Sequence, residues 1–115
     1  MVKNTNLLTT FLLITLMWFV ANVSYADNAM PIPRERQAEL HNLLLQDCGS
    51  CHGMTMKGGL GPALTAEVLK TRSREMIETT ILQGRPGTPM PPWKTILTKE
   101  EVRWIVDELY AGITL

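Results

Sequence analysis

The chain has few cysteines, no excess of either charge, no repeats and no strand pattern, and each absence excludes a class of protein. It has only two cysteines among 115 residues, so a multi-bridge disulfide framework is excluded. Neither sign of charge is in excess: eleven Lys and Arg balance eleven Asp and Glu, which argues against a basic nucleic-acid-binding face. Repeats and low-complexity runs are absent, and no segment alternates apolar and polar residues as a half-buried strand does. The absences leave one small domain without strands.

Both cysteines belong to one short motif, Cys48-Gly49-Ser50-Cys51-His52. The C-x-x-C-H spacing is typical of c-type haem attachment. In such a site the two thiols form thioethers with the haem vinyl groups, and the histidine binds the iron. Neither thiol is then available for a disulfide, and a covalently bound haem would stabilise the small fold instead.

Two other interpretations of this motif remain open at this point. A redox dithiol of the thioredoxin type requires C-x-x-C beside a strand and a helix, whereas the residues before Cys48 have a helical pattern. A zinc site would require further cysteine or histidine ligands, and His41 is the only other histidine. The motif therefore favours haem attachment over a redox dithiol or a zinc site.

The N-terminus has the pattern of an export signal. Lys3 provides positive charge, residues 7–20 are almost entirely apolar, and Ser24-Tyr25-Ala26 has small residues where a signal peptidase reads them. A membrane-spanning helix would need about 20 apolar residues, more than this run provides. We therefore expect residues 1–26 to be a signal peptide cleaved after Ala26. The mature protein would be periplasmic, with no stable membrane anchor.

The mature chain has an all-α pattern. Because Pro31 and Pro33 disfavour a helix, residues 27–33 are expected to be a flexible leader to a domain of residues 34–115. A one-sided apolar stripe predicts a helix over residues 34–47, which leads directly into the cysteine motif.

Capping residues predict the limits of two further helices. Thr98 and Glu101 form a capping-box signature, and Gly112 follows the last apolar position of that helix. Ser73 is expected to cap a helix that ends before Gly84. Residues 65–70 are expected to form a short turn.

Two loops between these helices have an unusual composition. Residues 58–64 read Gly-Gly-Leu-Gly-Pro-Ala-Leu, and such glycines allow the backbone to approach a flat ligand closely. The second loop, residues 84–93, contains Met90 between two prolines, which stiffen the backbone around its thioether. Met90 is therefore the candidate for a second axial ligand. If that position were empty or held by His41, a sensor or a peroxidase would be expected instead.

Taken together, these segments resemble a small class I cytochrome c. More narrowly, residues 47–55, 57–64 and 84–93 are similar to the NirC-type periplasmic cytochromes, also called cytochrome c-55X. The resemblance implies three to four helices wrapped around one covalently bound haem c. It also implies that the first and last helices cross near their ends, where Ala38 is the expected small residue.

The resemblance assigns roles to individual residues. Cys48 and Cys51 would hold the haem, with His52 and Met90 as axial ligands of the iron. The carbonyl of Pro62 would accept a hydrogen bond from the Nδ1 of the histidine and fix its tautomer.

Two residues of the second loop are expected near a haem propionate. Trp93 could donate its indole N–H to the propionate, and Arg85 could pair with the same group. For Trp93, simple packing against the porphyrin edge is the alternative.

Iron held between an imidazole and a thioether has no open position for a substrate, so we expect an electron carrier and not an enzyme. The resemblance implies a monomeric carrier with two redox partners. These would be a respiratory-chain donor and the nitrite reductase that carries both a c-type and a d-type haem. A redox accessory role in maturing the d-type haem of that reductase is the alternative.

Overall fold

The computed structural model describes residues 31–113 of the chain. The predicted signal peptide and its cleavage after Ala26 lie outside these residues. All the regular structure of the described part is helical, which confirms the all-α prediction. No helix within residues 31–113 is both long enough and apolar enough to cross a membrane.

The first helical segment is longer than the sequence pattern indicated. Helix α2 (Arg34–Leu43) continues through a π-helical turn, η2 (Leu44–Cys48), into helix α3 (Gly49–His52). These three elements form one continuous helical rod over residues 34–52. Gly53, with φ of 86°, ends the rod in a backbone conformation that glycine adopts readily. The whole cysteine motif therefore lies on helical backbone, with Cys48 at the end of the π-turn.

Helices α4 (Ala66–Leu69) and α5 (Arg74–Gln83) follow the long loop after the motif. The Oγ of Ser73 accepts a hydrogen bond from the backbone N of Met76, at 3.2 Å, so the predicted cap of α5 is confirmed. Gly84 follows the end of this helix, as expected.

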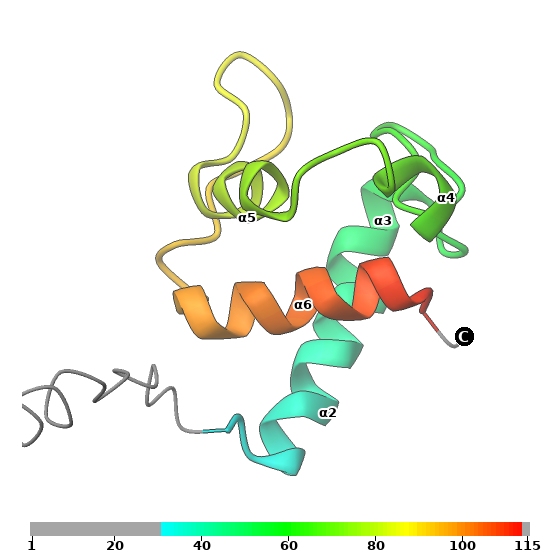
Figure 1. The fold of residues 1–115 in the computed structure, drawn as a ribbon. Helices are drawn as coiled ribbons and strands as arrows, with labels where there is room; N and C mark the ends of the chain where they lie inside the picture. Colours follow the sequence, from blue (N-terminus) through cyan, green and yellow to red (C-terminus); the bar gives the residue numbers. More distant parts are fainter. Residues whose placement is uncertain (1–30, 114–115) are drawn as a thin grey trace, which may run out of the picture. The chain divides into compact units, whose positions relative to one another are not determined.

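The last helix, α6 (Lys99–Ala111), begins and ends where its capping signals predict. Thr98 and Glu101 form both hydrogen bonds of the capping box, and Gly112 follows the C-terminal end. In Figure 1, α6 crosses the rod formed by α2 and α3, and α5 packs against α6.

The core is a single cluster of buried apolar side chains. The rod and α6 contribute six of them, and the Met56 loop, α4 and the turn before α6 contribute one each: Leu40, Leu44, Val102, Ile105, Val106, Leu109, Met56, Leu69 and Leu97. Ala38 is exposed, so its prediction as the small residue of the helix crossing was wrong. The buried stripe of the rod passes instead through Leu40 and Leu44, four residues apart, which places them on one face.

The described end of the predicted leader is held against the domain. Ile32 packs against the core cluster, and its carbonyl accepts a hydrogen bond from the Nε2 of Gln37 at 2.8 Å. The compact unit begins at Pro31. Ile32 therefore acts as part of the domain, although two prolines flank it.

One carboxylate joins the first and last helices. Glu101 Oε1 accepts a hydrogen bond from Arg36 Nε at 2.6 Å, and its Oε2 accepts one from the backbone N of Thr98 at 2.8 Å. The hydrogen bond from Arg36 is the main reason that the pKa of Glu101 is lowered from its usual value, although burial acts in the opposite direction. In the same pair the pKa of Arg36 is raised. Glu101 therefore caps α6 and fastens α2 to it.

This contact predicts a dependence of stability on pH. The unfolded chain binds a proton at Glu101 near about pH 4.3, whereas the folded chain does so only at lower pH. The stabilisation is therefore complete above about pH 5 and is lost as the pH falls through the lowered pKa of the folded state. We expect Glu101→Gln to lower the denaturation midpoint at pH 7 and to flatten its decline as the pH falls below about 5. Urea unfolding of the holoprotein across this range measures both effects.

Glu100→Gln is the matched control, because Glu100 is an exposed neighbour on the same first turn of α6. This variant should retain the wild-type pH dependence. Equal flattening in the two variants would contradict a specific role for Glu101.

Candidate functional site

His52 sits at the end of the helical rod with its side chain almost wholly buried, 9% exposed. Its Nδ1 lies 2.7 Å from the carbonyl oxygen of Pro62. Because a carbonyl can only accept, Nδ1 carries the proton and Nε2 keeps a free lone pair. No hydrogen bond is formed by Nε2, and no buried polar side-chain atom within residues 31–113 lacks a partner, so Nε2 is accessible. This is the tautomer that a metal-binding histidine requires.

The loop after the motif holds its backbone directly against the His52 ring. A Cβ at Gly61 would lie 2.7 Å from the ring Cε1 and 2.8 Å from Nδ1, so only glycine fits there. Gly61 N also donates to the carbonyl of Cys51 at 2.8 Å. The sequence suggested that these glycines approach a flat ligand, whereas at Gly61 the close neighbour is the histidine ring itself.

The two cysteines of the motif are free thiols, and both are half-buried. Burial, with a smaller contribution from the Asp47 charge, raises the pKa of the Cys48 thiol to about 11. A thioredoxin-type nucleophile needs a lowered thiol pKa, which a position at the beginning of a helix provides. Cys48 instead lies toward the C-terminal end of the helical rod, so the structure gives the redox-dithiol interpretation no support.

Met56 is a residue whose role the sequence did not indicate. It has a positive φ of 56° and is only 3% exposed, and its side chain belongs to the core. Its backbone N donates to the carbonyl of Gly53, and its own carbonyl accepts from Leu64 N at 2.9 Å. The surrounding loop has no periodic pattern, so nothing in the sequence marks this methionine as buried.

The loop that carries Met90 leaves the end of α5 and returns to it, as the yellow segment of Figure 1 shows. The Met90 side chain is half-buried, and its carbonyl accepts a hydrogen bond from Arg85 N at 3.1 Å. Trp93 N then donates to the carbonyl of Ile81 at 3.1 Å, which closes the loop on the last turn of the helix.

The two residues predicted beside a propionate differ in their surroundings. Trp93 is half-buried and packs against the core cluster, as its packing alternative would require. Arg85 is exposed, and its side chain forms no ion pair or hydrogen bond with the described residues. A role for either residue at a propionate stays a prediction.

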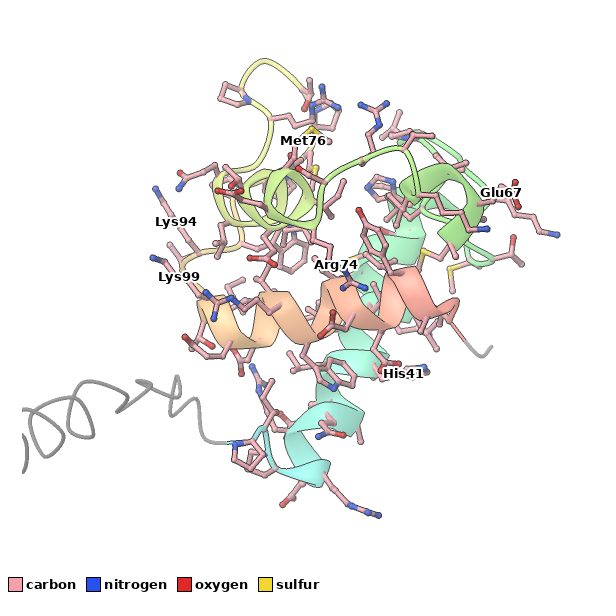
Figure 2. The ribbon with its side chains drawn as sticks, viewed as in Figure 1. His41, Glu67, Arg74, Met76, Lys94 and Lys99 are labelled. Carbon is pink, nitrogen blue, oxygen red and sulfur yellow. The ribbon has the colours of Figure 1, made fainter. Side chains whose placement is uncertain are left out.

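The competing ligand candidates lie elsewhere. Met76 is 41% exposed, and Figure 2 shows it on the side of α5 that faces away from α6. The α5 residues that pack against the core are instead Ile77, Ile81 and Leu82. His41 is half-buried on α2, far along the rod from the motif.

The donor set fits a c-type haem. Two free thiols three positions apart and an imidazole with a free Nε2 lone pair all come from the end of one helical rod. Two loops held by backbone hydrogen bonds follow the rod, and the second, residues 84–93, contains the half-buried Met90. A haem of this type could be attached through Cys48 and Cys51 and bound at its iron by His52.

Comparison with known proteins agrees with this chemistry. Residues 35–107 match the family described as cytochrome c oxidase, cbb3-type, subunit III. Three similar proteins are each called cytochrome c55X: one from Pseudomonas aeruginosa is 57% identical over 77 residues, one from Stutzerimonas stutzeri 54% over 78, and one from Paracoccus denitrificans 51% over 81. These matches cover 67, 68 and 70% of this chain and 65, 69 and 79% of the relatives, so the chain spans just under two thirds of the Pseudomonas protein.

A solved structure described as the c-type cytochrome NirC has the same fold. It is 55% identical in sequence and superposes with a TM-score of 0.68, covering 72% of this chain and 96% of that chain.

Proposed function

Because this chain belongs to the cytochrome c55X family of small c-type cytochromes, whose members hold haem c covalently, we propose that it carries single electrons between redox proteins in the periplasm. One observation carries the proposal. The His52 ring is held by the Pro62 carbonyl in the tautomer that leaves Nε2 free, directly beside two free thiols.

The residues of the motif would each have a separate task. When bound, the haem supplies reversible one-electron exchange between ferric and ferrous iron. Cys48 and Cys51 would hold it against the end of the helical rod through thioether bonds. The Pro62 carbonyl orients the His52 ring and increases the basicity of Nε2, which strengthens this nitrogen as a ligand.

Met90 would supply the other axial ligand. A thioether is a soft donor that favours ferrous iron and so raises the reduction potential. The proline-braced and hydrogen-bonded loop would hold the sulfur in a similar place in both oxidation states. With both axial positions filled, a substrate would have no place to bind, and the protein would act as a carrier.

We propose a nitrite reductase carrying c-type and d-type haems as the electron acceptor, with a respiratory-chain protein as the donor. The resemblance of residues 47–55, 57–64 and 84–93 to the cytochromes that accompany this reductase supports the assignment. The interface would be small and short-lived, as is usual for redox encounters.

Stopped-flow mixing tests the proposed acceptor. The reduced holoprotein should be oxidised by the reductase at a rate that rises with reductase concentration, followed in the visible haem bands. Negligible transfer would eliminate the donor role. If a deletion strain also contained reductase polypeptide without d-type haem, the accessory role in haem maturation would replace it.

A further inference from the structure

The backbone around Met90 has few hydrogen bonds available to hold it. Residues 89, 91 and 92 are prolines, so Met90 N is the only backbone donor between positions 89 and 92. The prolines restrict φ, but they have no N–H groups that could form hydrogen bonds to hold the loop against the rest of the fold. Other residues must determine where the methionine sulfur lies.

Gly84 provides the surface on which this backbone rests. It is buried, and a Cβ built on it would lie 2.6 Å from the carbonyl carbon of Pro91, 2.7 Å from Pro92 N and 2.8 Å from the carbonyl oxygen of Met90. All three neighbours are backbone atoms, so no side chain can rotate to make room. Any larger residue at position 84 must displace the peptide units on either side of Pro91.

Thr88 provides the second constraint. Its Oγ1 donates to the carbonyl of Arg85 at 2.7 Å and accepts from Met90 N at 3.3 Å. The hydroxyl therefore joins the first turn of the loop to the single backbone donor of its proline-rich part. The carbonyl of Met90 is held in turn by Arg85 N at 3.1 Å.

We infer that Gly84 and Thr88 are positioning residues that place the Met90 sulfur for binding to the haem iron. The inference rests on the proposed function, in which Met90 is an axial ligand. Gly84 acts through the path of the backbone, and Thr88 acts through its hydroxyl. Neither needs to touch the haem, and each should change the strength of sulfur ligation when altered.

The test of Gly84 has a matched control in the same loop. Gly84 and Gly87 both have positive φ, 66° and 79°, but a Cβ at Gly87 would meet no atom within 4 Å. Both Gly84→Ala and Gly87→Ala place a Cβ on backbone with positive φ, and only the first also displaces the Met90 backbone. In oxidised holoprotein we expect Gly84→Ala to lose the weak red sulfur-to-iron charge-transfer band and to bind added imidazole about tenfold or more tightly. Gly87→Ala should retain the band and the wild-type imidazole affinity.

Thr88 supplies a second, milder test if Gly84→Ala does not fold. Thr88→Val keeps the shape of the side chain but removes both hydrogen bonds, and should increase imidazole affinity by about two- to tenfold. Thr88→Ser keeps the hydroxyl and should restore the wild-type value. If Thr88→Val and Thr88→Ser bind imidazole equally, the role of the hydroxyl is overturned.

The outcomes distinguish a failure of this inference from a failure of the proposed function. If the wild-type protein shows no red band, Met90 ligation fails and the inference fails with it. If the wild type shows the band, and Gly84→Ala and Gly87→Ala both retain it with equal imidazole affinity, the positioning role of Gly84 is overturned while the proposed carrier function stands.

Discussion

Replacing Cys48 and Cys51 together by alanine is expected to reduce the covalently retained haem from nearly all of the purified protein to none. Each thiol is free in the structure and available for one thioether bond, and the chain has no third cysteine to substitute. His52 alone could bind iron, but only by a reversible bond. Acid–acetone extraction followed by haem staining of a denaturing gel measures the covalent fraction directly.

Ser50→Ala is the control for this double variant. Ser50 lies between the cysteines and is exposed, and its Oγ donates only to the Asp47 carbonyl within the same helical turn, apart from a long contact with Cys51 Sγ at 3.8 Å. The control should retain covalent haem. Pigment that survives extraction from the double variant would show that the haem is attached elsewhere, and a wild-type protein without covalent pigment would refute the haem assignment itself.

Met90→Ala is expected to remove the red charge-transfer band and to lower the reduction potential by roughly 0.1 V or more, a modest part of the roughly 0.8 V range that axial ligands span. The soft sulfur stabilises ferrous iron, so its loss favours the ferric state. The open position should also bind imidazole without competition. Visible spectra and redox titration of the holoprotein provide the measurements.

Met54→Ala and Met76→Ala serve as controls for the methionine variant. Both side chains are more exposed than that of Met90, at 54 and 41%. Neither lies in the loop of residues 84–93 that carries Met90, and neither change should alter the band or the potential. If Met76→Ala abolished the band while Met90→Ala did not, the axial ligand would come from α5.

The local signals of this sequence correctly predicted where α5 and α6 begin and end. Ser73 caps α5, and the Thr98–Glu101 box caps α6, because such contacts join residues three positions apart and their spacing can be read directly. The cysteine motif is equally local, and so predicted its own chemistry without knowledge of the fold. The continuation of the first helix through a π-turn was missed, since the motif residues carry no apolar periodicity.

The sequence by itself determined the helical class and the caps, and it indicated the candidate donor atoms. Only the tertiary structure decided how those donors are held. Gly61 lies against the His52 ring, and Gly84 lies beneath the peptide after Met90. Each contact depends on the path of a loop that leaves and returns, and a glycine in the sequence does not say which atoms will approach it. The wrong prediction for Ala38 has the same cause, because a helix crossing depends on which face the partner helix covers, and that face was set by Leu40 and Leu44.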